Sequence, residues 1–310
     1  MKCTTCKAQA VVALPSHTAG FCEHCFLAFF TRQVEKGIRR AKLFTFEDKI
    51  LVALSGGKDS LALMLILHEL GYNVTGLHID LAIPGSSAQA RAIVEAFCSR
   101  HGLNLIVRDM AEEGLAIPDV KKRLRRPVCS ACGKIKRYFF NKAALDGGYT
   151  VLATGHNLDD EIARLFSNIL RWDISYLSDQ GPYLPASGGF AAKVKPLYRL
   201  SEFETANYAF LKGIDWHWAP CPYSPGATFT YYKKLWANLE EEMPGRKLDF
   251  YLGFLKNGRT AFSREEDLSG APLVPCKVCG YPTSSIVCGV CRIREAMSQS
   301  EESGRAELDF

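Results

Sequence analysis

The stretch LVALSGGKDSLALML, residues 51–65, places a polar, glycine-rich break between two apolar segments. Its first residues read as a buried strand and its last residues as the start of a helix. Backbone N–H groups at a helix start carry partial positive charge, and glycines let an anion approach them closely. Lysine and serine side chains add a positive charge and hydroxyl donors. The stretch therefore predicts a phosphate-binding loop, rather than a simple glycine turn, formed by Ser55, Gly56, Gly57, Lys58, Asp59 and Ser60.

Strand and helix patterns alternate around this loop. Strands are predicted at residues 49–55, 73–80, 103–110 and 150–157, and helices at 60–71, 88–102, 132–148 and 158–171. This alternation is typical of an α/β fold with a doubly wound parallel sheet and helices on both faces. Ligands of such sheets bind beyond the carboxyl ends of the strands. The motifs SGGKDS, HID and TGHNLDD end three of the predicted strands, so we expect them to line one cleft.

The cysteines divide the chain into parts, and only Cys98, which is expected in the core, stands outside their pattern. Two C-x-x-C pairs at each end predict a closed zinc site of four thiolates, with His24 as an alternative ligand in the first site. The predicted ligands are Cys3, Cys6, Cys22 and Cys25 at the start, and Cys276, Cys279, Cys288 and Cys291 at the end. We predict an N-terminal zinc-binding module at residues 1–30, a catalytic domain with a helical extension at 31–270, a C-terminal zinc-ribbon module at 271–297 and a disordered tail at 298–310.

Three central cysteines, Cys129, Cys132 and Cys221, allow more than one chemistry. They suit a redox pair with a carrier thiol, a [4Fe–4S] cluster with one iron left open, or a structural zinc site. Cysteine pairs in such number are typical of a cytosolic metalloprotein rather than a secreted disulfide protein. The sequence has no apolar run of the roughly 18–20 residues that span a membrane, and no secretory signal. We therefore expect a cytoplasmic protein without a membrane partner.

Charged residues next to these motifs add a further signal. Asp159, Asp160 and Glu161 begin a predicted helix, where carboxylates favour the helix dipole but also suit magnesium binding or proton transfer. We predict that Asp160 is the functional one. Between Val120 and Leu145 the chain has no acidic residue and nine basic ones, although its net charge is only +5. This run favours contact with an RNA backbone over a merely solvated face.

The two main motifs also carry a family resemblance. SGGKDS resembles the PP-loop of the ATP pyrophosphatase superfamily, and ATGHNLDDE, residues 153–161, resembles the signature of tRNA thiolation enzymes. The strings GLHIDL, SACGKIKRY, DQGP, KVKPLYR, MPG and CGYPTSSIVCGVC extend the similarity over nearly the whole chain, to the TtuA group of tRNA 2-thiouridine synthetases. Two positions depart from that group, because Asp80 stands where relatives often have glutamate and Cys25 where they have histidine. Both changes are conservative in chemistry.

The resemblance implies a role for individual residues. ATP and Mg²⁺ would bind at the PP-loop, with His78, Ile79 and Gly155 also contributing to the nucleotide site, although His78 also suits an ordinary place at the core edge. Cys129, Cys132 and Cys221 would hold a [4Fe–4S] cluster, and the terminal sets would hold two Zn²⁺ ions. The implied catalytic residues are Lys58, Asp59, Lys136 and Asp160.

The resemblance also implies a reaction. The O2 atom of a tRNA uridine would be adenylated by ATP, and sulfur carried on the cluster would then displace AMP to give 2-thiouridine, most favourably at the T-loop ribothymidine. Wobble-uridine thiolation and a PP-loop amidating or lysidine-type tRNA ligase are the alternatives, and a non-catalytic RNA-binding zinc protein is a third. A ubiquitin-like thiocarboxylated carrier protein or free sulfide would donate the sulfur, and the enzyme would be a homodimer.

Overall fold

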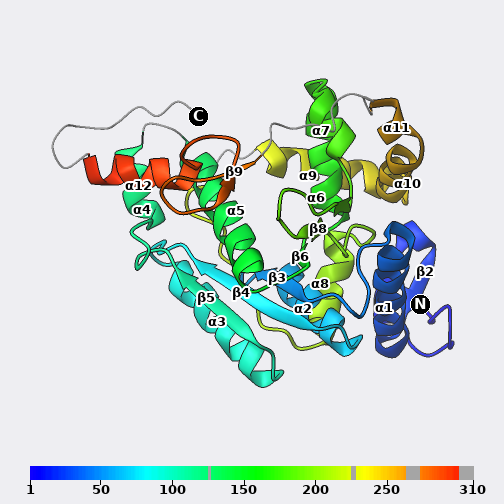
Figure 1. Cartoon of the computed structure of the whole chain (residues 1–310). Helices are drawn as coiled ribbons and strands as arrows, with labels where there is room; N and C mark the ends of the chain where they lie inside the picture. Colours follow the sequence, from blue (N-terminus) through cyan, green and yellow to red (C-terminus); the bar gives the residue numbers. More distant parts are fainter. Residues whose placement is uncertain (125–126, 225–227, 263–272, 300–310) are drawn as a thin grey trace.

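The computed structural model describes residues 1–124, 127–224, 228–262 and 273–299. Its centre is a six-stranded sheet in the order β5-β4-β3-β6-β8-β7 (Figure 1). In chain order the strands are β3 Ile50–Leu54, β4 Val74–Asp80, β5 Leu105–Asp109, β6 Val151–Thr154, β7 Tyr183–Leu184 and β8 Ala192–Val194. The predicted strands are confirmed, and β3 lies in the middle, parallel to both β4 and β6.

One edge of the otherwise parallel sheet is antiparallel. Strand β8 pairs parallel with β6, but β7 pairs antiparallel with β8. Only a short connection separates these two strands, and a backbone bridge between Ser187 and Phe190 closes it. So short a link allows only an antiparallel pair, because a parallel pair needs a crossover of a dozen or more residues.

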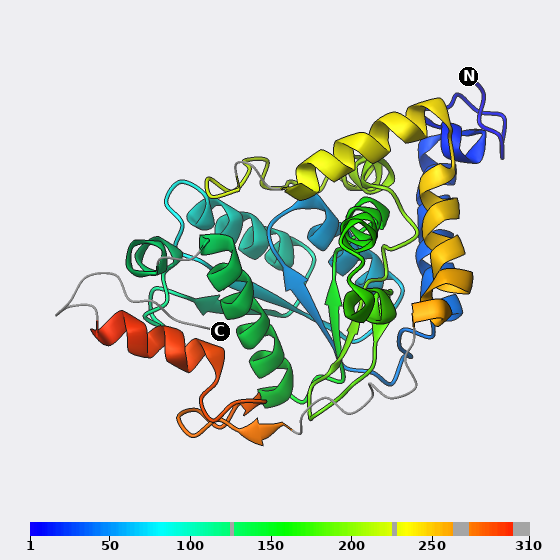
Figure 2. The ribbon, with the colours of Figure 1, turned by 90° about the horizontal axis from the view of Figure 1, so that it is seen from above.

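Helices cover both faces of the sheet, as predicted (Figure 2). Ile50, Val52 and Leu54 of β3 join the apolar cluster that contains helices α1 and α2, whereas Leu51 packs with residues of α5 on the opposite face. Successive side chains of β3 thus pack alternately against the helices on the two faces of the sheet. The helices between the strands are α2 Lys58–Glu69, α3 Ser87–Arg100, α4 Ile117–Arg123, α5 Val128–Asp146, α6 Leu158–Leu170 and α7 Ile174–Asp179.

The N-terminal module is continuous with the core. It contains β1 Val12–Leu14, the 3-10 helix η1 Pro15–His17, β2 Ala19–Phe21 and helix α1 Glu23–Ala41. The predicted boundary after residue 30 lies inside α1, which buries Phe26, Phe30 and Val34. A single helix therefore links the first cysteine set to the sheet.

Helices dominate the remainder of the chain, as predicted. They are α8 Glu202–Leu211, α9 Thr228–Glu242, α10 Arg246–Gly253, the π-helix η2 Phe254–Gly258 and α11 Arg259–Phe262. The C-terminal module consists of β9 Val274–Pro275, β10 Pro282–Thr283 and α12 Gly289–Gln299. No helix in the described ranges is long and apolar enough to cross a membrane. Arg125 and Arg126 of the basic run, the predicted boundary at residues 270–271 and the predicted tail beyond residue 299 lie outside the described residues.

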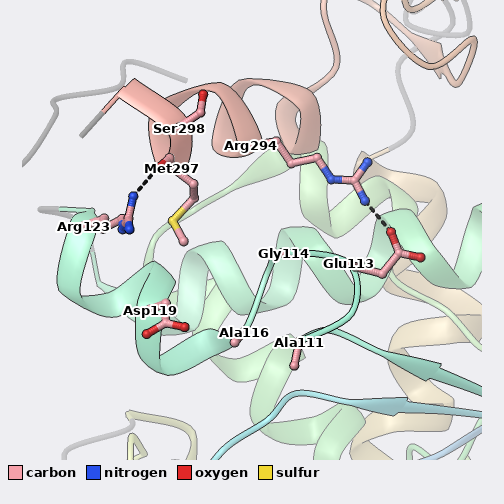
Figure 3. Close-up of a pocket in the computed structure, with 9 residues that line it drawn as sticks. All are labelled: Ala111, Glu113, Gly114, Ala116, Asp119, Arg123, Arg294, Met297 and Ser298. Atoms are coloured by element: carbon pink, nitrogen blue, oxygen red, sulfur yellow. Dashed lines mark hydrogen bonds and ion pairs between the residues drawn. The ribbon is translucent and has the colours of Figure 1, made fainter. Parts of the chain in front are cut away.

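Helix α12 is fastened to the core beside a pocket (Figure 3). Arg294 pairs with Glu113 in the loop after β5, at 2.5 Å between Nη2 and Oε2. Arg123 of α4 donates a hydrogen bond to the backbone carbonyl of Met297. Both guanidinium groups thus hold the C-terminal module against α4 and the β5–α4 loop.

Gly155, directly after β6, lies very close to the backbone at the start of α2. A Cβ atom at this position would lie 2.8 Å from the backbone nitrogen of Ser60 and 2.9 Å from the carbonyl carbon of Asp59. We expect Gly155→Ala to lower the free energy of unfolding by about 1–3 kcal/mol, because the backbone must shift. Urea denaturation measures the change. Gly253→Ala is the control, because nothing lies within 4 Å of its added Cβ; equal stability of the two variants would contradict the prediction.

Candidate functional site

The loop between β3 and α2 is fixed by its own serines. Gly56 has a positive φ of 81°, which favours glycine. The hydroxyl of Ser60 accepts a hydrogen bond from the backbone nitrogen of Ser55 at 3.2 Å and donates one to the carbonyl of Gly57 at 2.9 Å. The first N–H groups of α2 have no acceptor within the helix. The loop therefore fits a phosphate group through its backbone amides, while Ser60 holds its shape.

Two lysines and three carboxylates surround this loop. Lys58 Nζ lies 3.0 Å from Asp59 Oδ2 and 2.9 Å from Glu202 Oε1. Lys233 Nζ lies 2.6 Å from Asp160 Oδ1 and 3.2 Å from Glu202 Oε2. Glu202 begins α8 and Lys233 lies on α9, so both come from elements outside the predicted motifs. Burial alone would raise the pKa of Glu202, but hydrogen bonds and charge from the two lysines lower that pKa to about 2.

The three acidic residues at the start of α6 occupy different environments. Asp159 accepts hydrogen bonds from Lys247 Nζ at 2.5 Å and from the backbone nitrogen of Glu202 at 2.7 Å. Glu161 is fully buried and accepts a 2.8 Å bond from the Tyr251 hydroxyl. Asp160, with 28% of its side chain exposed, is the most accessible of the three. Its position is consistent with the predicted choice, while its neighbours hold the helix in place.

Asp160 also forms a capping box with Asn157. Each side chain bonds the other residue's backbone nitrogen, at 3.1 Å in both directions. The Asn157 amide donates a second hydrogen bond to Asp59 Oδ1 at 3.0 Å. Asn157 therefore ties the start of α6 to the start of α2. The contact between Asn157 and Asp59 has no signal in the sequence, although the Asn-x-x-Asp spacing marks the cap.

His78 and Ile79 lie near the end of β4, beside the loop, and both are buried. Because the carbonyl of Leu54 only accepts, His78 Nδ1 donates to it over 2.9 Å, which leaves Nε2 as an acceptor. Nε2 is buried and has no hydrogen-bond partner in the described part of the chain. Burial lowers the pKa of His78, so the ring is neutral. An orphaned acceptor of this kind fits the exocyclic amine of adenine.

The central cysteines come together from two segments. The predicted helix begins at Cys132, but α5 begins four residues earlier, at Val128 after the N-cap Pro127, so Cys129 and Cys132 lie in its first two turns. The thiol of Cys129 donates to the backbone carbonyl of Tyr223 at 3.5 Å, so the segment with Cys221 packs against the start of α5. Burial raises the pKa of the Cys132 thiol, and Lys136, one turn later, opposes this shift. The charge of Cys221 also affects Cys132.

One backbone contact joins this segment to the phosphate loop. The backbone nitrogen of His217 donates to the carbonyl of Gly56 at 2.9 Å. Cys221 follows four residues later and is exposed, as is Cys129. Exposed thiols beside a phosphate loop fit a reactive group that must meet a substrate, rather than a closed structural metal site. Cys98, in contrast, is buried in the core, as predicted, and burial raises its pKa to about 11.

The terminal cysteines form two compact sets. The four sulfurs of each set lie within 4.8 Å of one another, a spacing that fits one tetrahedral ion, and His24 belongs to neither set. The backbone nitrogen of Cys288 donates to Cys276 Sγ at 3.2 Å, as expected around a thiolate. Among the described residues, Cys129, Cys132 and Cys221 do not form a third such set.

Part of the basic run is already engaged in local contacts. Lys121 Nζ lies 4.4 Å from the centre of the Tyr223 ring, and Lys142 pairs with Asp146. Lys122 pairs with Asp119 at 3.4 Å. Lys121, over Tyr223, and Lys136, one turn after Cys132, thus lie near the central cysteines, whereas Lys142 lies about 15 Å along α5 from Cys132. The run is therefore a positively charged surface that extends away from the thiols, with several of its members held in position.

Comparison with known proteins agrees with this geometry. Residues 30–221 match the PP-loop domain model, and residues 2–27 match the model of the N-terminal LIM domain of the 2-thiouridine synthetase TtuA. The chain belongs to the TtuA-like family of PP-loop tRNA thiolases. The tRNA-5-methyluridine(54) 2-sulfurtransferase of Thermus thermophilus is 42% identical, over 96% of this chain and 92% of the relative. The protein of the same name from Pyrococcus horikoshii is 41% identical, over 94% and 93%.

A solved structure extends the similarity to the whole thiolase fold. The U34-tRNA thiolase NcsA from Methanococcus maripaludis, solved with its [4Fe–4S] cluster, aligns with a TM-score of 0.78 and 26% identity. The alignment covers 100% of this chain and 99% of NcsA. The predicted family and fold are thereby confirmed, and so is the prediction that this chain is a tRNA-thiolating enzyme.

The low pKa of Glu202 predicts a pH dependence. Its pKa lies below the usual 4.5, so the stability that the ionised side chain contributes is present above pH 4.5 and is lost as the pH falls towards 2. We expect wild type to be more stable than Glu202→Gln above pH 4.5, and the difference to shrink between pH 4.5 and 2. Urea titrations of both proteins measure it. A difference that grows on acidification would contradict this assignment.

The two compact cysteine sets predict two zinc ions per chain. We expect Cys276→Ser to lower the bound zinc from about two equivalents to about one, because a four-thiolate site loses a ligand. Metal analysis by mass spectrometry measures the stoichiometry. Cys98→Ser is the matched control and should retain both ions, since Cys98 belongs to neither set. Unchanged zinc in Cys276→Ser would refute the C-terminal site.

Proposed function

We propose that this protein converts 5-methyluridine at position 54 of tRNA into its 2-thio derivative, with ATP as the activating substrate. The observation that carries the proposal is the 2.9 Å bond between His217 and Gly56, which brings the phosphate loop beside the segment with Cys221. The relatives named for position 54 are considerably more similar in sequence than the thiolase named for U34. This difference favours the T-loop over the wobble position.

The first step activates the base. The triphosphate lies on residues 55–60, and the O2 atom of the uridine attacks the α-phosphorus while pyrophosphate leaves. Lys58 and Lys136 offset the negative charge that develops on the phosphate. Asp160 binds magnesium or takes the uridine proton, since it is the accessible carboxylate beside the loop. His78 and Ile79 contact the adenine, and Gly155 keeps β6 close to the loop.

The second step transfers sulfur. Cys129, Cys132 and Cys221 would hold a [4Fe–4S] cluster, which when bound would supply an iron site open to sulfur. Sulfur adds to C2 of the adenylated base, the C2–O2 bond breaks, and AMP leaves with the oxygen. Lys136, one turn after Cys132 on α5, offers a positive charge to the departing AMP.

Further features belong to the same proposal. Residues 31–270 form the catalytic domain, and the modules at 1–30 and 271–297 each hold a structural zinc ion. The sulfur donor is a ubiquitin-like thiocarboxylated carrier protein or free sulfide. The enzyme acts in the cytoplasm as a homodimer.

The test is a thiolation assay on anaerobically reconstituted protein with ATP, magnesium, sulfide and unmodified tRNA. We expect wild type and Cys98→Ala to give 2-thiolated nucleoside in the T-loop, detected by mass spectrometry of mapped fragments. Cys221→Ala should lower thiolation at least 100-fold while ATP binding is retained, because it removes a cluster ligand and leaves residues 55–60 intact.

Each other outcome contradicts a defined part of the proposal. Thiolation at the wobble base would keep the mechanism and change the target. Full activity in Cys221→Ala would refute the role of the central cysteines. ATP cleavage to AMP and pyrophosphate without sulfur in any nucleoside would point to a ligase of the amidating or lysidine type.

A further inference from the structure

Trp218, an exposed aromatic residue, borders the site but has no part in the proposed chemistry. It is 79% exposed. An aromatic ring left in water beside a positively charged site suits stacking with an unpaired base. We propose that Trp218 is a stacking platform for an unpaired base of the tRNA next to the reacting uridine. This inference rests on the proposed function.

Trp218 is held rigidly from below. Its ring packs on Trp216, with centroids 4.5 Å apart and an angle of 31° between the planes. Trp216 in turn packs against the main apolar cluster, and the intervening His217 bonds Gly56. The chain between Trp218 and Cys221 spans at most about 11 Å. A base stacked on Trp218 would therefore lie close to both the phosphate loop and the thiols.

The surrounding charge suits RNA rather than an apolar protein surface. Lys234 follows Lys233 on α9 and is exposed, and Lys121 lies over Tyr223 in the segment that contains Trp218 and Cys221. Aromatic rings among lysines are typical of sites for unpaired RNA, in which bases stack and phosphates pair with cations. A uridine in a folded loop must leave its stack before its C2 can meet the phosphate, and its neighbours then need new stacking partners.

The test is a binding measurement on the full-length reconstituted protein. Fluorescence anisotropy gives the affinity for unmodified tRNA, and for a fully paired RNA hairpin, at several salt concentrations. We expect Trp218→Ala to bind tRNA at least about 5-fold more weakly. The salt slope and the affinity for the paired hairpin should stay unchanged, because no phosphate contact is lost. Trp218→Phe should retain most of the affinity.

Three variants serve as controls. Lys234→Ala should weaken binding to both the tRNA and the paired hairpin, and it should lower the salt slope by about one. Trp172→Ala and Phe210→Ala remove equally exposed rings, at 68% and 74%, and should bind tRNA normally. Trp172 lies just beyond the far end of α6, about 20 Å from the acidic residues that begin this helix, and Phe210 lies about 12 Å along α8 from Glu202.

The outcomes separate this inference from the proposed function. If wild type thiolates tRNA and Trp218→Ala binds it as tightly as the Trp172→Ala control, the stacking role is wrong and the enzyme assignment stands. If wild type neither binds nor thiolates tRNA, the proposed function fails. Unchanged tRNA affinity with a selective loss of sulfur transfer from a carrier protein would assign the Trp218 ring to a protein partner instead.

Discussion

The hydrogen bond from the His217 backbone nitrogen to the Gly56 carbonyl joins the two halves of this enzyme. Gly56 shapes the nucleotide side, and the segment after His217 supplies Cys221 to the sulfur side. One such bond contributes only about 0.5–1.5 kcal/mol of stability, so it matters chiefly because it places the segment after His217 beside the loop. It fixes where an activated base must lie if a thiol-bound group is to reach it. The positive φ of Gly56 and the packing of Trp216 on the core both support that contact.

Charge around the loop explains why ATP would arrive with a metal. Two cations, Lys58 and Lys233, face three carboxylates, Asp59, Asp160 and Glu202, so the cluster carries a net charge of one minus when all are ionised. A triphosphate adds further negative charge, which the partial positive charge at the start of α2 offsets only in part. Magnesium bound with ATP would offset more of it, and accessible Asp160 offers a carboxylate ligand. The carboxylates that now pair with Lys58 and Lys233 could therefore also bind a metal ion.

Local patterns made much of this structure predictable. The apolar strand β3, the glycine loop and the C-x-x-C pairs depend on neighbours in sequence, and the structure has them where expected. Strands β7 and β8 were missed because segments of two and three residues show no periodicity. Glu202 and Lys233 were missed for another reason: each meets the loop only through the tertiary fold. No local spacing connects Cys221 with Cys129 and Cys132, so the residues alone left their chemistry open and only the family resemblance assigned them to one cluster.

The terminal modules extend this division into two halves. Cys25 lies in the first turn of α1, and Phe30 of that helix stacks on Tyr208 of α8 at 4.0 Å, the helix that begins with Glu202. At the other end, Cys276, Cys288 and Cys291 share an apolar cluster with Ala131 and Ile135 of α5, the helix that carries Cys129 and Cys132. Metal bound at the first module therefore stabilises a helix of the nucleotide side, and metal bound at the second stabilises a helix of the sulfur side. Because the two sides meet at Gly56 and His217, loss of either metal would disturb the distance over which sulfur must be transferred.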